Sequence, residues 1–181
     1  MKIICLGDSL TYGYAISRRY IWTSLAAAIT GFDIVNQGIN GDTTGGMLSR
    51  FQRSVLDEKP DAVLVIGGAN DIFASSSLDN VKANIFSMRH LAANANIAFL
   101  AGTPLPIDFQ TVPQRWASFS DMQKADELCR IYTDWLKSFC AAFGAKLIDL
   151  WSLYEKAVKN SAASLYLDGL HPNQEGHQII A

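Results

Sequence analysis

The sequence predicts an α/β protein, a three-layer α/β/α sandwich around a parallel sheet of five strands. Two observations predict this fold. Short, nearly continuous apolar runs recur along the chain, and the longer segments between them carry apolar residues at helical spacings. Continuous apolar runs are typical of parallel strands, which are buried on both faces. Strands that alternate with helices form a sheet with helices packed on each side.

The individual elements follow from these two patterns in chain order. The apolar runs predict strands over Ile3–Leu6, Phe32–Val35, Ala62–Ile66, Ile97–Ala101 and Lys146–Leu150. Helical spacing of apolar residues predicts helices over Trp22–Ile29, Met47–Leu56, Val81–Ala93 and Ala125–Phe143. The length of 181 residues suits a single domain over 1–181, because domains usually contain about 100–200 residues.

Composition limits the classes of partner. Hydrophobic residues make up 49% of the chain, which is enough for a sizeable core. Charged residues make up 18%, and the formal net charge is −2, which argues against disorder and against a basic surface for nucleic acid. No apolar run reaches the length of about 18 residues that a membrane-spanning helix needs. We therefore expect a small-molecule partner, whereas the oligomeric state stays open.

The start of the chain and its cysteines bear on the compartment. The first predicted strand begins almost at Met1 and leaves no room for a signal peptide, so a cytoplasmic location is expected unless a processed leader has been replaced. Cys5, Cys129 and Cys140 lie in apolar patterns without the paired spacing of metal ligands. We expect them to be buried free thiols, and no disulfide framework is indicated.

Polar segments follow the first three predicted strands, and a fourth lies near the end of the chain. In order they are Gly7-Asp8-Ser9-Leu10, Asn36-Gln37-Gly38-Ile39-Asn40-Gly41-Asp42-Thr43, Gly67-Gly68-Ala69-Asn70-Asp71 and Asp168-Gly169-Leu170-His171-Pro172. Open parallel sheets bind ligands beyond the carboxyl ends of their strands. Ser9, Gly41 and Asn70 are therefore expected to surround one site.

Three residues of these segments suit nucleophilic catalysis. A serine hydroxyl is a poor nucleophile at neutral pH, so chemistry at Ser9 needs a base and a group that orients the base. His171 is the candidate base, and Asp168 is the candidate for holding its imidazole in the right tautomer. The offset of three residues allows this only if the loop between them turns suitably. Asp8, beside Ser9, is expected to hydrogen-bond amides of its own turn.

Taken together and in this order, the four segments resemble the conserved blocks of the SGNH hydrolase superfamily, the GDSL esterases and lipases. The resemblance extends from Gly7 to His171. The stretches Gly-Asp-Ser-Leu-Thr-Tyr-Gly-Tyr and Asn-Gly-Asp-Thr are particularly similar to a small bacterial branch with acyl-CoA thioesterase, protease, lysophospholipase and arylesterase activities. A flavodoxin-like sheet and an acyl ester or thioester substrate are what the resemblance implies, with no cofactor.

The resemblance also implies a role for each matching residue. Ser9 would be the nucleophile, and Asp168 and His171 the acid–base pair. The oxyanion hole would consist of the backbone amides of Ser9 and Gly41 and the side chain of Asn70. Such donors must be fixed in place before the oxyanion forms. A glycine at position 41 suits both the approach of a carbonyl and unusual backbone dihedral angles.

Other interpretations of the same residues stay open. Gly41 also suits a turn in which Asp42 or Thr43 caps the next helix, and Asn70 also suits a helix start. The fold is compatible with a catalytically silent carbohydrate- or lipid-binding module, or with a flavodoxin-like nucleotide or phosphate binder. No glycine fingerprint of a nucleotide site and no histidine cluster of a metal site is present. His90 and His177 lie among polar neighbours and are expected at the surface.

The sequence says least about the substrate. A long segment without regular pattern runs from Thr103 to a helix expected at about Met122, and long loops are usually functional. Aromatic and apolar residues near the site either line an acyl or aryl pocket or pack onto the core: Tyr12, Tyr14, Ile72, Phe73, Trp116 and Phe119. Carbohydrate acetyl esters, aryl esters, acyl thioesters and lysophospholipids all stay open. A short terminal helix is expected, which would either cover the sheet less fully and support His171 less firmly, or leave Ile179 and Ile180 free to contact another subunit.

Overall fold

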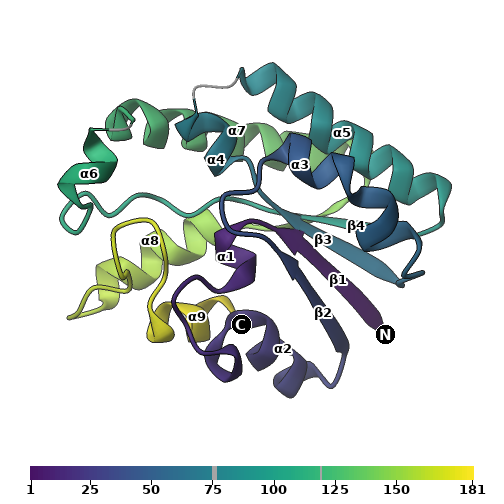
Figure 1. Ribbon diagram of the computed structural model, residues 1–181, viewed down its shortest axis with the longest axis horizontal. Helices are drawn as coiled ribbons and strands as arrows, with labels where there is room; N and C mark the ends of the chain where they lie inside the picture. Colours follow the sequence, from purple (N-terminus) through teal and green to yellow (C-terminus); the bar gives the residue numbers. More distant parts are fainter. Residues whose placement is uncertain (75–76, 119) are drawn as a thin grey trace.

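The fold is a parallel five-stranded sheet with helices on both faces, as the sequence predicts (Figure 1). The computed structural model describes residues 1–74, 77–118 and 120–181. The strands are β1 Lys2–Gly7, β2 Asp33–Gly38, β3 Ala62–Ile66, β4 Ala98–Gly102 and β5 Lys146–Ile148, in the order β2-β1-β3-β4-β5. This is the flavodoxin-like order, which reverses between β1 and β3 and opens a crevice beyond the carboxyl ends of these strands.

Most predicted helices are present. Helices α2 Trp22–Thr30, α5 Leu78–Asn94 and α7 Met122–Phe143 lie where the helical spacing indicates. The predicted helix over 47–56 is instead split into α3 Thr44–Ser49 and a π-helical segment Gln52–Leu56. The remaining elements are α1 Ser9–Tyr12, a 3-10 turn Arg18–Tyr20, α4 Ala69–Phe73, α6 Gln114–Ala117, α8 Leu150–Asn160 and the short terminal helix α9 Gln174–Ile180.

Each face of the sheet carries its own hydrophobic core. Ile4 and Leu6 of β1 face a core that includes residues of α3, α5 and α7. Cys5, between them, faces a second core that includes residues of α2 and α8. Alternate residues of a strand point to opposite faces, which explains why the central strands read as continuous apolar runs. Figure 1 places α3, α4, α5 and α7 on one side and α1, α2, α8 and α9 on the other.

The edge strands depart from the prediction that every strand is buried on both faces. In β2, Asp33 is exposed and the residues from 34 to 38 are only partly buried, because the strand has a single neighbour. The strand predicted over 146–150 ends at Ile148. Asp149 instead caps α8 by accepting a hydrogen bond from the Ser152 N–H at 3.1 Å, and Leu150 begins the helix.

The burial of the cysteines and histidines agrees only in part with the prediction. Cys5, Cys129 and Cys140 are free and buried, as predicted. His90 is exposed, as predicted, but His177 is fully buried, so its predicted surface position is wrong. The polar neighbours of His177 on α9 face solvent, whereas the histidine itself faces α2. Within the ranges described, no helix has the length and apolar character needed to cross a bilayer.

Candidate active site

Ser9 stands directly beyond the carboxyl end of β1. It is the first residue of α1, a helix of four residues that ends at Gly13. Asp8 caps this helix, because its Oδ1 accepts a hydrogen bond from the Leu10 N–H at 3.0 Å. The predicted interaction of Asp8 with an amide of its own turn is therefore present. The cap fixes the orientation of the turn that carries the Ser9 hydroxyl.

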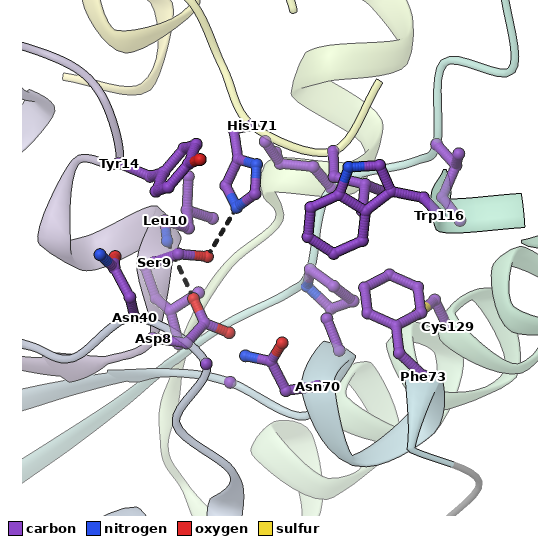
Figure 2. A pocket seen from close by; sticks show the side chains of 18 of the residues that line it. Asp8, Ser9, Leu10, Tyr14, Asn40, Asn70, Phe73, Trp116, Cys129 and His171 are labelled. Atoms are coloured by element: carbon purple, nitrogen blue, oxygen red, sulfur yellow. Dashed lines mark hydrogen bonds between the residues drawn. The ribbon is translucent and has the colours of Figure 1, made fainter. Parts of the chain in front are cut away.

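The side chains of Ser9, His171 and Asp168 form one continuous hydrogen-bonded line, and Figure 2 shows its contact between Ser9 and His171. The distance from Ser9 Oγ to His171 Nε2 is 2.9 Å. On the other side of the ring, His171 Nδ1 lies 2.9 Å from Asp168 Oδ2 and 3.0 Å from Oδ1. These are the contacts that a serine nucleophile, its base and an orienting carboxylate require.

The turn between Asp168 and His171 makes the offset of three residues workable. Asp168 Oδ1 accepts hydrogen bonds from the backbone N–H groups of Leu170 at 3.2 Å and His171 at 2.9 Å. Gly169 has φ +77°, and a Cβ there would lie 2.5 Å from the Asp108 carbonyl oxygen, so only glycine fits. Although burial by itself would raise it, hydrogen bonds from His171 hold the pKa of Asp168 below its usual value. The carboxylate is therefore ionised at neutral pH.

Two aromatic rings flank the imidazole of His171. The Tyr14 ring centroid is 4.3 Å from that of His171, and the Trp116 centroid is 6.3 Å away in an edge-on arrangement. Figure 2 draws them on opposite sides of the histidine. The side chain of His171 is only 11% exposed. Its orientation is thus fixed by packing as well as by Asp168.

Ser9, Gly41 and Asn70, which are predicted to supply the oxyanion donors, line one pocket. Gly41 has φ +75°, a conformation that favours glycine, although nothing would obstruct a side chain there. Within the described part of the chain, the N–H groups of Ser9 and Gly41 reach no hydrogen-bond acceptor. Asn70 Nδ2 donates to the Asp42 carbonyl oxygen at 2.9 Å, which leaves its second N–H available. In Figure 2 this amide nitrogen points toward Asp8 and Ser9.

Arg50 organises this region, and the sequence analysis did not identify it. Its guanidinium binds the Asp42 carboxylate through Nε at 2.9 Å and Nη2 at 2.8 Å. Nη2 also donates to the carbonyl oxygens of Gly7 and Gln37, at the ends of β1 and β2. Thr43, rather than Asp42, caps α3. One largely buried cation, with a side chain 10% exposed, thus joins the strand before Ser9 to the segment that carries Gly41.

The pocket beside Ser9 has a volume of about 240 Å³ and a mainly apolar lining. Of the six residues considered for an acyl pocket, Tyr14, Phe73 and Trp116 line it. Ile72 is buried in the core instead, Tyr12 packs under Arg18, and Phe119 lies outside the described residues. Figure 2 shows Phe73, Trp116 and Cys129 together on the side away from Tyr14. Among the residues described, no group of three side chains could hold a metal ion.

Asp8 is the buried carboxyl group next to Ser9. It is 5% exposed, and burial raises its pKa to about 7, against the lowering effect of the hydrogen bond from Leu10. The negative charges of Asp42 and Asp71 raise it further. A carboxyl group whose pKa is higher in the folded state than in the unfolded state binds more protons when folded. Its contribution to stability is therefore lost as the pH rises from about 4 to 7.

Replacing Asp8 by asparagine is expected to remove the decrease in stability that Asp8 causes as the pH rises. The amide oxygen still accepts the bond from Leu10, but it carries no charge to bury. The free energy of unfolding of Asp8→Asn, relative to that of the wild type, should rise by about 2–3 kcal/mol between pH 5 and pH 8. Urea unfolding at both pH values measures the difference, and the exposed Asp57→Asn is the control. A constant difference would contradict the raised pKa.

Comparison with known proteins shows the family to which the chain belongs. Residues 5–179 match the model of the GDSL-like lipase/acylhydrolase family, and the chain belongs to this family. An arylesterase from Vibrio mimicus is 28% identical over a match that covers 99% of this chain and 84% of the arylesterase. An acetylxylan esterase from Geobacillus stearothermophilus is 23% identical over 83% of this chain and 69% of that esterase.

Some relatives are longer, and solved structures agree in fold. The chain spans only 59% and 52% of two plant GDSL esterase/lipases, from Oryza sativa subsp. japonica and Arabidopsis thaliana, each 27% identical to it. A structure from Veillonella parvula DSM 2008, a member of the lipolytic protein G-D-S-L family, superimposes with a TM-score of 0.85 at 23% identity, covering 99% of this chain and 93% of that one. At this identity the likeness establishes the fold alone.

Proposed function

We propose that the protein is a serine acyl-hydrolase that cleaves carboxylic esters, with Ser9 as nucleophile, His171 as base and Asp168 as orienting carboxylate. The observation that carries the proposal is the hydrogen-bonded line from Asp168 through His171 to Ser9 Oγ at the mouth of an apolar pocket. Family membership supports the same class of reaction. Two structures of the Geobacillus acetylxylan esterase are described as catalytic mutants, one at a histidine and one at a serine.

The geometry supports a two-step reaction. Ser9 Oγ attacks the acyl carbonyl while its proton passes to Nε2 of His171, and the resulting oxyanion accepts hydrogen bonds from Ser9 N–H, Gly41 N–H and Asn70. The imidazolium then gives the proton to the leaving alcohol or thiol, which departs and leaves an acyl group on Ser9. In the second step His171 takes a proton from water while the water oxygen bonds to the acyl carbon. The bond between that carbon and Ser9 Oγ then breaks, His171 returns the proton to Oγ, and the acid leaves.

The pocket limits the acyl group of the proposed substrate. An apolar cavity of about 150 Å³ accommodates benzene, so a pocket of about 240 Å³ suits an aryl ring or a short acyl chain. Among the residues that the structure describes, its lining contains no lysine or arginine, so a carboxylate or phosphate on the acyl side would be buried without a counter-charge. We therefore propose an uncharged, apolar acyl group, carried by an oxygen ester or a thioester.

Covalent labelling together with ester hydrolysis tests the proposed function. Purified wild-type protein is treated with a fluorophosphonate probe, and its turnover of p-nitrophenyl esters of increasing acyl length is measured. We expect labelling and turnover that both disappear in Ser9→Ala, with kcat/KM falling once the acyl chain exceeds the pocket. A wild-type protein that is neither labelled nor active would contradict the proposal and favour a binding module on the same fold.

Asn70→Ala tests the oxyanion donors separately from the nucleophile. Loss of one such donor costs about 10²–10³-fold in kcat, because the bond is strongest to the oxyanion of the transition state. We expect a decrease of that size in Asn70→Ala with KM within about twofold of the wild-type value. Asn70→Asp keeps the shape but presents a negative charge to the oxyanion, and is expected to be worse. Steady-state kinetics on p-nitrophenyl acetate decides, and an unchanged kcat would exclude Asn70 from the oxyanion hole.

A further inference from the structure

His177 lies outside the pocket, yet it connects the two segments that carry Ser9 and His171. It belongs to α9, the helix that follows His171, and it is fully buried against α2. Its Nδ1 accepts a hydrogen bond from the backbone N–H of Trp22 at 3.2 Å. Because that N–H is the donor, Nδ1 carries no proton and the ring proton resides on Nε2.

The acceptor supplied by His177 meets a need of α2. Trp22 is the first residue of this helix, and the N-cap residue Ile21 offers no side-chain acceptor. The first N–H groups of a helix have no partner within it. The His177 side chain, from a distant helix, therefore caps the N-terminus of α2 in place of the usual serine or aspartate.

Trp22 makes a second link, from α2 to the turn of the nucleophile. Its indole Nε1–H donates to the carbonyl oxygen of Leu10 at 3.0 Å. Leu10 is the neighbour of Ser9, and its own N–H is held by Asp8. Trp22 is 4% exposed and packs in the core on this face of the sheet, so its position is fixed.

We propose that Trp22 and His177 are positioning residues that hold Ser9 in register with His171. Together they close a ring of covalent and hydrogen bonds. From Ser9 the ring follows the chain to Leu10, whose carbonyl oxygen accepts from the Trp22 indole. The Trp22 backbone N–H then donates to His177. From His177 the ring follows the chain back to His171, whose Nε2 lies 2.9 Å from Ser9 Oγ. The inference rests on the proposed function, because it assigns these residues a part in the reaction of Ser9.

The chemistry of His177 argues against a purely apolar packing role. Nε2 is buried and, within the described ranges, has no hydrogen-bond partner, which costs stability. A leucine would fill much of the space without that cost. What the imidazole adds is the acceptor for Trp22. Burial lowers the pKa of His177 to about 4, with charge on His171 lowering it further, so the ring stays neutral and able to accept at neutral pH.

Three variants test the ring. Trp22→Phe keeps an aromatic ring but removes the indole N–H, and His177→Leu removes the acceptor. His177→Asn restores an acceptor, since the asparagine Oδ1 occupies a place close to that of the histidine Nδ1. The matched controls are Trp135→Phe, on α7 and away from the pocket, and the exposed His90→Leu.

The readouts are the rate of Ser9 labelling by a fluorophosphonate and the steady-state constants for p-nitrophenyl acetate. A displacement of about 1 Å between reacting groups costs about 10²-fold in rate. We expect Trp22→Phe and His177→Leu to lower both the labelling rate and kcat by about 10–100-fold, with KM within about twofold of the wild-type value. His177→Asn should recover most of the rate, and both controls should react like the wild type.

Melting temperatures distinguish positioning from stability. All rates are measured well below the lowest melting temperature of the series, so that each protein is folded. If Trp22→Phe and His177→Leu melt earlier but label at the wild-type rate, His177 only caps α2 and the inference is overturned. If the wild-type protein itself is not labelled, the proposed function fails and the inference fails with it.

A double variant gives an independent check. Loss of either hydrogen bond interrupts the ring. The double variant Trp22→Phe/His177→Leu should therefore lower the labelling rate and kcat about as much as the more damaging single change. Residues that act through one network show such non-additivity. Losses that multiply would mean that the two residues act separately, which contradicts the ring.

Discussion

Ser9→Ala is expected to lower kcat for p-nitrophenyl acetate by about 10⁴-fold or more, the largest effect of any single substitution in this protein. The change removes the atom that, in the proposed mechanism, attacks the carbonyl and forms the acyl-enzyme. The Ser9 hydroxyl bonds to His171 and does not belong to either hydrophobic core. The melting temperature should therefore change by only a few degrees, which differential scanning calorimetry can verify.

The double variant Ser9→Ala/His171→Ala tests whether the two residues act as one catalytic unit or contribute independently to the rate. His171 has no function in the first step once its proton donor is absent, so the double variant should be about as slow as Ser9→Ala alone. Arg53→Ala, at an exposed position of the π-helical segment, serves as the control for the effect of an unrelated substitution. Losses that add in free energy would contradict the proposed mechanism.

Asp168→Asn is expected to cost about 10²–10⁴-fold in kcat, the second largest effect. Oδ1 of Asp168 is held by two backbone N–H groups, those of Leu170 and His171. In the variant these donors keep the amide oxygen in place and turn the NH₂ group toward His171 Nδ1. The imidazole must then accept at Nδ1 and carry its proton on Nε2, where it cannot take a proton from Ser9.

A matched control completes the test of Asp168. Asp149→Asn is the control, because the Asp149 carboxylate also accepts a hydrogen bond from a backbone N–H but caps α8, outside the pocket. Its kcat should equal that of the wild type. A loss of less than about threefold in Asp168→Asn would point to a Ser9–His171 dyad that works without the carboxylate.

Much of the fold was predictable because its signals are local. The run Ala62–Ile66 is identical in prediction and structure, since a strand buried on both faces must be apolar throughout. β2 was less predictable, because its position at the edge of the sheet depends on which strands pair. Helix α8 was missed although Leu150, Trp151 and Tyr154 follow a helical spacing and are buried.

The residues of the site also differ in how far the sequence predicts them. Ser9, Asn70 and His171 lie in short motifs, so the sequence alone indicated that they belong together. Arg50 and His177 could not be found like this, because neither belongs to a motif. Arg50 acts on carbonyl groups at the ends of two strands, and His177 on a helix start 155 positions away in sequence. Contacts of side chains with distant backbone leave no pattern in the sequence.

The separation of Ser9 and His171 by 162 positions has a consequence for the time at which the protein becomes reactive. Contacts between residues so distant in sequence form only after the chain between them has been ordered. Under the proposed mechanism, a chain with β1 and α1 in place therefore carries an unactivated serine until the turn with His171 docks beside it. Labelling of Ser9 by a fluorophosphonate during refolding would therefore time the docking of that turn.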